Sequence, residues 1–169
     1  MRFVRFLFLS GQPYQIFSCL SASFFVALFS LSAGAGLCVT SNGVNLRAGP
    51  GSKYPITWKV EKFTPLAELQ SSGGWIQVED MDGEKHWVYG GNVTRKLVCV
   101  SVRVNAARLK KAPGPQGEPA DIKFVDKYTA FKRLDEQDDW YEVEASWGET
   151  YWVQSTNVWR PLRVARVNF

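Results

Sequence analysis

Apolar and polar residues alternate along several short segments of this chain. In residues 44–47, Val and Leu alternate with Asn and Arg, and residues 55–60, 66–70 and 75–79 follow the same period of two. Such alternation is typical of β-strands that are buried on one face. Between residues 38 and 163, no window of eleven residues carries the apolar stripe of a helix. The pattern therefore predicts an all-β protein.

Residues that favour turns separate the alternating segments. A Gly-Pro-Gly run at 49–51 follows the first segment, and the pair Asp82-Gly83 has the preferred composition of a tight hairpin turn. Residues 90–93 are expected to form a single helical turn. Short strands with turns at this spacing indicate a small barrel or sandwich.

The same series of segments occurs twice. Residues 44–51 return in similar form at 107–114, an offset of 63, and residues 75–79 return at 140–144, an offset of 65. A period above sixty is too long for a solenoid unit, which has about 20–50 residues. It is long enough for a small domain with its own core. The repeat therefore predicts two tandem copies of one small β-domain.

The first copy resembles a known family, the bacterial SH3-like domain. Its opening segment, 44–55, has the family's Asn-Leu-Arg followed by Gly-Pro-Gly. The Gly-Trp-Ile-Gln-Val segment at 74–78 and the Trp-Val pair at 87–88 are similar to the family's distal hairpin. The closing residues, 90–93, resemble its short final helical turn.

The resemblance is weaker in the second copy. There, Ala-Arg-Leu-Lys at 107–110 takes the place of Val-Asn-Leu-Arg. The fold class that the resemblance implies is all-β, with two tandem small SH3-like β-barrels. These barrels are expected at residues 36–100 and 101–165.

The first 35 residues have the organisation of a secretory signal peptide. Arg2 and Arg5 are their only charged residues, an apolar stretch covers 16–31, and small residues lead up to Ala35. Cleavage after Ala35 would export the protein to the periplasm or the extracellular space, with no membrane attachment. The alternative is an uncleaved anchor, because the stretch and the residues after it could span ~30 Å of hydrocarbon.

Charge gives no reason to expect a nucleic-acid partner. The chain has 20 basic and 16 acidic residues and a formal net charge of +4, and cleavage after Ala35 would lower this to +2. The densest basic group, within 103–111, is interpreted as a solvated face. Nucleic-acid-binding proteins usually have a more basic domain and a recognisable fold signature.

The cysteines predict a disulfide. Of the three cysteines, Cys19 lies in the expected signal peptide, so the exported protein would keep Cys38 and Cys99. An even number in an oxidising compartment favours pairing. The resemblance supports the pairing, because the two chain ends of an SH3-like barrel lie side by side. The alternative is two small buried residues on neighbouring strands.

The residue inventory argues against an enzyme, a metal site and a cofactor. His86 is the only histidine, and with Cys38 and Cys99 it cannot supply the usual ligands of a zinc site. We expect His86 to lie on the surface, opposite Trp87. The acidic residues within 79–84 are at a hairpin tip, where acids are usually solvated.

Candidate ligand contacts are the outward-facing residues and the aromatic residues that packing symmetry leaves unexplained. Asn45 and Arg47 flank Leu46 and should point outward together. Arg47 could grip a carboxylate with a forked pair of hydrogen bonds, or both residues could tie down the 49–51 loop through backbone carbonyls. Four aromatic residues have no partner of the same type in the other copy: Tyr54, Trp58, Trp147 and Trp159. The tryptophans that do repeat, such as Trp75, are expected to have structural roles.

The resemblance implies a function in the bacterial cell envelope. We expect a non-catalytic, exported binding module that recognises peptidoglycan or an envelope protein. The alternative is a structural or adaptor protein that uses both barrels for protein–protein interaction.

Overall fold

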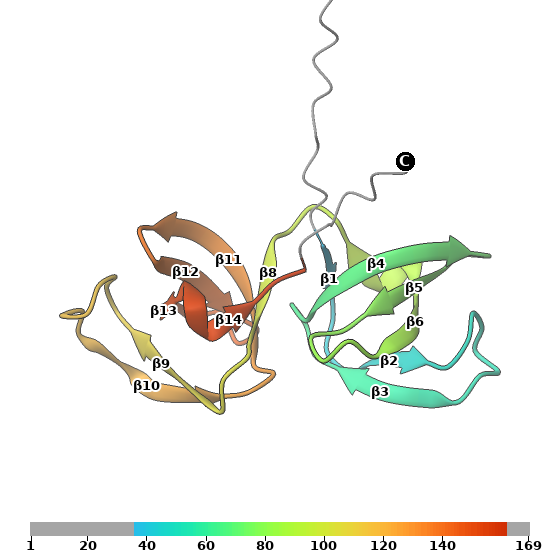
Figure 1. Ribbon diagram of the computed structural model, residues 1–169, viewed down its shortest axis with the longest axis horizontal. Helices are drawn as coiled ribbons and strands as arrows, with labels where there is room; N and C mark the ends of the chain where they lie inside the picture. Colours follow the sequence, from blue (N-terminus) through green and yellow to red (C-terminus); the bar gives the residue numbers. More distant parts are fainter. Residues whose placement is uncertain (1–35, 162–169) are drawn as a thin grey trace, which may run out of the picture. The chain divides into compact units, whose positions relative to one another are not determined.

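The computed structural model describes residues 36–161, which form β-strands and two single-turn 3-10 helices (Figure 1). The predicted signal peptide at 1–35, including Cys19, lies outside the described residues, as do residues 162–165 of the second predicted domain. No helix within the described part of the chain is long and apolar enough to cross a membrane.

The first sheet contains seven strands, all paired in antiparallel fashion. In spatial order they are β3 (Ile56–Val60), β2 (Val44–Arg47), β6 (Lys85–Tyr89), β5 (Trp75–Glu79), β4 (Pro65–Ser72), β1 (Leu37–Val39) and β7 (Val93–Thr94). The 3-10 helix η1 (Gly90–Asn92) connects β6 to β7, where the sequence predicts a helical turn. Gly83 forms the β5–β6 hairpin turn with a φ of 85°, as its Asp-Gly pair predicts.

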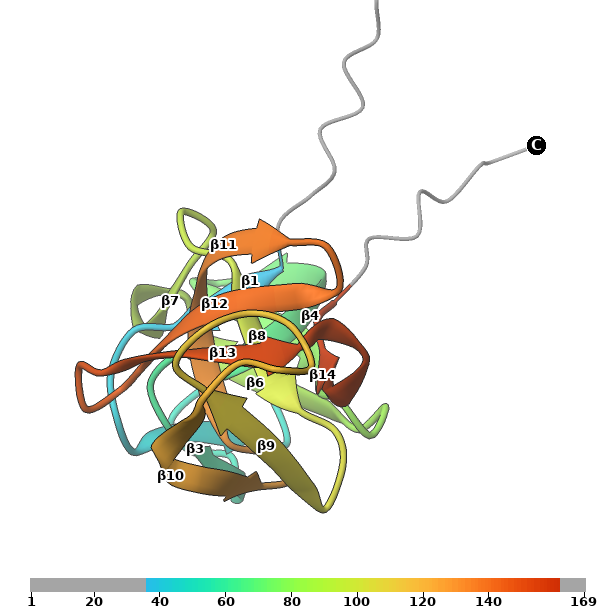
Figure 2. The ribbon, with the colours of Figure 1, turned by 90° about the vertical axis from the view of Figure 1, so that its left-hand side faces the viewer.

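The second sheet repeats this order with its own seven strands (Figure 2). They are β10 (Pro119–Asp126), β9 (Ala106–Lys110), β13 (Thr150–Gln154), β12 (Trp140–Ala145), β11 (Ala130–Gln137), β8 (Cys99–Val102) and β14 (Val158–Trp159). Helix η2 (Ser155–Asn157) occupies the place of η1. The all-β class is thus confirmed, and the two sheets fit two small β-domains.

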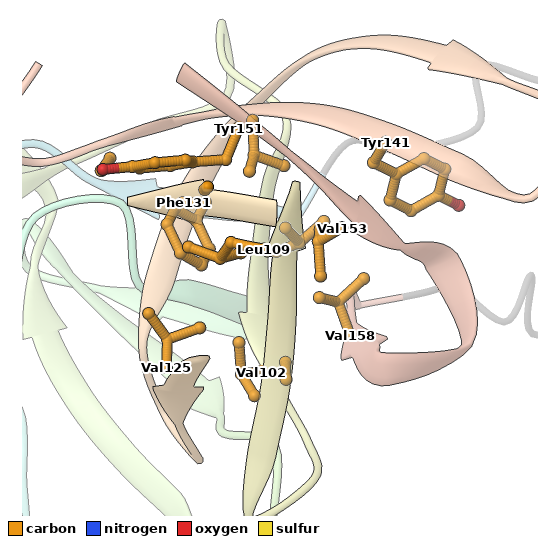
Figure 3. Close-up of a cluster of buried hydrophobic side chains, with 13 residues drawn as sticks. Val102, Leu109, Val125, Phe131, Tyr141, Tyr151, Val153 and Val158 are labelled. Carbon is orange, nitrogen blue, oxygen red and sulfur yellow. The ribbon is translucent and has the colours of Figure 1, made fainter. Parts of the chain in front are cut away.

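Each sheet encloses a separate hydrophobic core. In the first, alternation along β2 buries Val44 and Leu46. In the second, Phe131 and Leu109 lie side by side among valines from β8, β12 and β13 (Figure 3). The inward residues are therefore the apolar members of the alternating segments, which explains why the pattern predicted the strands.

A third buried cluster joins the two sheets. Cys38 of β1 and Cys99 of β8 form a disulfide, with their Cα atoms 5.7 Å apart. Phe63 and Ala130 are buried against them, and Leu97 covers the cluster in part. We call these residues the junction cluster. The disulfide predicted from the sequence is therefore present, and it connects the first strand of one sheet to the first strand of the other.

The disulfide should contribute a large share of the stability. It links residues separated by 61 positions, and closing a loop of that length stabilises a protein by about 4 kcal/mol in the chain-entropy model. We expect urea unfolding of the oxidised protein to give a free energy higher by about this amount than unfolding in the presence of a reducing agent.

A double Cys38→Ser, Cys99→Ser variant provides the control. It should unfold like the reduced protein and should not respond to the reducing agent. Equal unfolding midpoints for oxidised and reduced wild-type protein would contradict this role of the disulfide.

Candidate functional site

Two hollows in the described surface bring together polar and aromatic residues. The larger is a cleft of about 690 Å³, lined by β3, the β5–β6 hairpin, and Ser101 and Tyr128 of the second sheet. We call it the junction cleft. The smaller, of about 300 Å³, is lined only by residues between Ser41 and Asn92. We call it the outer groove, because all of its strand residues except the buried Val44 point away from the core.

The outer groove follows from the alternation along three strands. Leu46 is fully buried, so its neighbours Asn45 and Arg47 point outward together, as predicted. Ile76 is buried in the same way, which turns Trp75 of β5 outward into the groove.

Trp75, which was expected to have a structural role, packs across the β5–β6 hairpin and also lines the outer groove. Tyr89 of β6 lies opposite Trp75 in the strand ladder and is 51% exposed. The two ring centroids are 5.8 Å apart, at an interplanar angle of 64°. Sequence reasoning missed this pair, although the burial of Ile76 and Val88 at alternate positions is visible in the sequence pattern.

Arg47 supports the loop that follows β2. Its Nη1 donates a hydrogen bond of 2.7 Å to the carbonyl of Tyr54. Gly49 faces the Tyr54 ring so closely that an added Cβ would lie 2.5 Å from it. The expectation that Arg47 ties down the Gly-Pro-Gly loop through a backbone carbonyl is therefore confirmed. Tyr54 packs in this loop and lines neither hollow.

Two aromatic rings from different sheets meet at the junction cleft. Trp58 of β3 is 54% exposed and Tyr128, in the turn before β11, is 49% exposed. Their ring centroids are 6.5 Å apart and the planes are tilted by 58°. Trp58 was predicted as a ligand contact. Tyr128 was not, although Lys127-Tyr128-Thr129 repeats Lys62-Phe63-Thr64 at the offset of 65.

His86 is a buried wall of the junction cleft, so the expectation of a surface histidine was wrong. Its Nδ1 is 2.8 Å from the Thr57 hydroxyl, and its Nε2 is 3.4 Å from a carboxylate oxygen of Asp80. His86 does face away from Trp87. However, that side of β6 is the inner side, because Val88 on the same face is fully buried.

The acidic hairpin tip is more than a solvated loop. Asp80 accepts backbone hydrogen bonds of 2.9 Å from both Asp82 and Glu84, which fixes the turn. Asp82 accepts a hydrogen bond of 3.0 Å from Lys127 of the second sheet. The Tyr128 hydroxyl and then Lys127 lower the pKa of Asp82 by hydrogen bonding to its carboxylate. The tip therefore contacts the second sheet.

The other predicted contacts lie outside both hollows. Trp147 is 49% exposed at the β12–β13 hairpin, and its ring packs at centroid distances of 6.3 Å from Phe131 and 6.4 Å from Tyr151. Trp159 is half-buried in β14, where it pairs with Ser101. Neither tryptophan lines the cleft or the groove.

Three residues of the basic group are exposed, as expected for a solvated face: Arg103, Arg108 and Lys111. Only Lys110 departs from this expectation. It is buried, and its Nζ donates hydrogen bonds of 2.8 Å to the carbonyl of Gly114 and 2.6 Å to that of Pro115. The same Nζ lies 4.9 Å from the centroid of the Trp140 ring. Lys110 thus supports a loop in the second sheet, as Arg47 does in the first.

Comparison with known proteins gives a family for the first sheet. Residues 40–94 match the model of the family described as bacterial SH3 domain. Over 111 residues the chain is 35% identical to the probable cell wall amidase LytH of Staphylococcus aureus, an alignment that covers 63% of this chain. The chain spans only 38% of the length of that relative.

Solved structures give weaker matches. NlpC1 from Trichomonas vaginalis aligns with 15% identity and a TM-score of 0.32, over 78% of this chain and 48% of its own. The structure titled endolysin LysPBC5 CBD aligns with 18% identity and a TM-score of 0.30, over 75% of this chain and 94% of its own. Both TM-scores are low, so neither structure informs the function of this chain.

The contacts of Asp82 can be tested by titration. Because Tyr128 and Lys127 lower its pKa, Lys127→Ala and Tyr128→Phe should each raise it toward the ordinary value. The stabilisation of the ionised Asp82 is present above its unfolded pKa and is lost as the pH falls through the lowered folded pKa. NMR of the carboxyl carbon against pH measures the shift directly.

Lys62→Ala is the matched control for Lys127→Ala. Lys62 occupies the equivalent turn position, with its Nζ 4.6 Å from the Phe63 ring centroid, and forms no ion pair with Asp82. The Lys62→Ala variant should therefore leave the pKa of Asp82 unchanged. An Asp82 pKa that does not respond to either Lys127→Ala or Tyr128→Phe would contradict the assigned contacts.

Proposed function

Because residues 40–94 form a bacterial SH3 domain, we propose that this protein is a non-catalytic binding module of the bacterial cell envelope that attaches to peptidoglycan. The relationship to a probable cell wall amidase supports this proposal. The part of the relative that matches this chain would hold the relative at the wall. This chain would perform the same attachment.

The observation that carries the proposal is the composition of the outer groove, which lies entirely within the matched residues. It combines half-buried Trp75 and exposed Tyr89 with the side chains of Asn42, Asn45 and Asn92. Aromatic faces pack on sugar rings and peptide planes, and Asn side chains both donate and accept hydrogen bonds. Peptidoglycan offers acetamido sugars and peptide amides, which match both kinds of group.

Arg47 adds a charged donor to the lining of the outer groove. A guanidinium has five N–H donors, and the Tyr54 carbonyl engages only Nη1. The remaining donors are available to a carbonyl or carboxylate of the ligand. The hydrogen bond to Tyr54 also holds the guanidinium in place, which lowers the entropy cost of binding.

The disulfide supports an exported location. Disulfides persist in oxidising compartments and are rare in the cytosol. The Cys38–Cys99 bond lies in the buried junction cluster, where it connects the two sheets. We propose that the protein works outside the cytoplasm, in the periplasm or at the cell surface.

The absence of catalysis is part of the proposal. Thr57, His86 and Asp80 form a hydrogen-bonded series, and a histidine can activate a hydroxyl in such a series. However, one oxygen of Asp80 is occupied by the backbone of the turn, and His86 is buried beneath the cleft. We propose that the series fixes the cleft wall and performs no reaction. New products from muropeptides incubated with the protein would contradict this.

One observation favours the adaptor function as a second candidate. Edge strand β10 exposes Ile122 and Phe124, at 40% and 54% of their surfaces. Exposed apolar residues on an edge strand are a surface to which another protein can add. An adaptor would leave insoluble peptidoglycan unbound and would bind an envelope protein instead.

Co-sedimentation with purified, insoluble peptidoglycan tests the proposed function. Wild-type protein should be depleted from the supernatant. Tyr89→Ala should weaken binding about tenfold, as expected for the loss of one aromatic contact. Because Tyr89 is largely exposed, the melting temperature should change little.

Trp147→Ala is the control variant for this experiment. It removes an aromatic residue of similar exposure that does not line the outer groove, so it should sediment like wild-type protein. Two results would count against the proposal: no depletion of the wild-type protein, or equal losses for Trp147→Ala and Tyr89→Ala.

A further inference from the structure

The geometry of the junction cleft points to a second binding site, and we infer that it takes a neutral saccharide packed against Trp58 and Tyr128. This goes beyond the proposed function. It concerns a different surface, which requires both sheets, and it does not depend on whether the outer groove binds peptidoglycan.

The first argument is backbone strain at Tyr128. Tyr128 has a φ of 73°, and Phe63, at the same position of the turn in the first sheet, has a φ of 71°. The same backbone bond defines both turns: Phe63 N–H donates to the Val39 carbonyl and Tyr128 N–H to the Val102 carbonyl. A bulky residue with this φ is uncommon, and glycine would adopt it without strain. Each aromatic residue therefore needs a reason to be there.

The two positions differ in what their rings do. Phe63 is 3% exposed and packs in the junction cluster, so its burial compensates for the strain. Tyr128 is 49% exposed and lines the cleft. Burial does not account for Tyr128, and strained residues in general cluster at active sites, ligand clamps and switch regions.

The second argument is that the Tyr128 ring is held in one orientation. It contacts Trp58 on one side, and Lys127 Nζ lies 4.6 Å from its centroid. Lys127 also donates a hydrogen bond of 3.0 Å to Asp82, which holds its ammonium group beside the ring. The tilt of 58° between the Trp58 and Tyr128 planes creates a corner with two half-exposed faces. A ligand would meet aromatic walls that are already ordered, which favours binding.

The third argument is the charge around this corner, which selects the class of ligand. Two acids of the cleft lining are already engaged, Asp80 by the backbone of the turn and Asp82 by Lys127. The other charged residues of the lining carry both signs of charge: Lys59, Glu61, Glu84 and Lys85. None of them forms an ion pair within residues 36–161. A polyanion or a polycation would meet like charges there. A neutral saccharide would not, and its hydroxyl groups can hydrogen-bond to ammonium and carboxylate groups alike.

The dimensions of the cleft agree with a small-molecule ligand. Its volume of about 690 Å³ lies within the range of about 300–1,000 Å³ for ligand pockets. Aromatic faces pack on the C–H faces of sugar rings, while the hydroxyl groups at the ring edges reach the charged side chains. Trp58 and Tyr128 would therefore supply the contact area, and the charged residues would supply the hydrogen bonds.

NMR titration of the 15N-labelled protein with an N-acetylglucosamine tetrasaccharide tests the inference. The indole N–H signal of Trp58, assigned with a Trp58→Phe variant, should shift in a saturable manner, while that of Trp147 should not. Maltotetraose, which lacks acetamido groups, tests the requirement for them. Weaker binding of maltotetraose assigns the site to acetamido sugars, and equal binding assigns it to neutral saccharides in general.

Substitutions of Tyr128 separate binding from folding. Tyr128→Gly removes the ring, and glycine adopts the positive φ without strain, so the protein should remain folded. It should bind the tetrasaccharide about tenfold more weakly, because one aromatic contact is lost. Tyr128→Phe keeps the ring and should retain most of the affinity. Wild-type affinity in folded Tyr128→Gly would overturn the inference.

Two further results would overturn the inference about the junction cleft without affecting the proposed function of the outer groove. No saturable shift of Trp58 with either saccharide would overturn the inference, as would a shift confined to Trp75 of the outer groove. The Tyr89→Ala variant distinguishes this inference from the proposed function. It should lose affinity for insoluble peptidoglycan while the tetrasaccharide still shifts the Trp58 signal.

Discussion

The junction between the two sheets is the constraint on which the larger site depends. The Cys38–Cys99 disulfide and the burial of Phe63 and Ala130 hold the first strands of the sheets together. The disulfide-linked junction places Tyr128 of the second sheet beside Trp58 of the first, which lowers the entropy cost of binding at this corner. The outer groove does not need this junction, because the first sheet alone supplies its residues.

The two copies of the fold have therefore acquired different tasks at equivalent positions. Phe63 seals the junction, whereas Tyr128 in the same strained turn faces the cleft. Arg47 and Lys110 each support a loop through backbone carbonyls, yet Arg47 lines a groove and Lys110 is buried. The second copy thus contributes Tyr128 to the junction cleft, whose other aromatic wall, Trp58, comes from the first copy.

The sequence pattern predicted the features that depend on neighbouring residues of one strand, which are the core positions and the side-chain directions. The alternation around Leu46 gave the core and the outward direction of Asn45 and Arg47, and the cysteine count gave the disulfide. Apart from the disulfide, the sequence pattern did not predict contacts between the sheets, such as Lys127 with Asp82, because these depend on how two separate elements meet. His86 was misplaced for a related reason: alternation gives opposite faces, but only packing decides which face is inward.

Calorimetric titration of oxidised and reduced protein tests the central claim most directly, with disaccharide-peptide fragments of peptidoglycan as the ligand for the outer groove and the neutral N-acetylglucosamine tetrasaccharide as the ligand for the junction cleft. We expect the oxidised protein to bind both ligands. After reduction, we expect the fragments still to bind and the tetrasaccharide to bind more weakly or not at all. Tetrasaccharide binding that reduction leaves unchanged, or no binding of either ligand, would contradict the account.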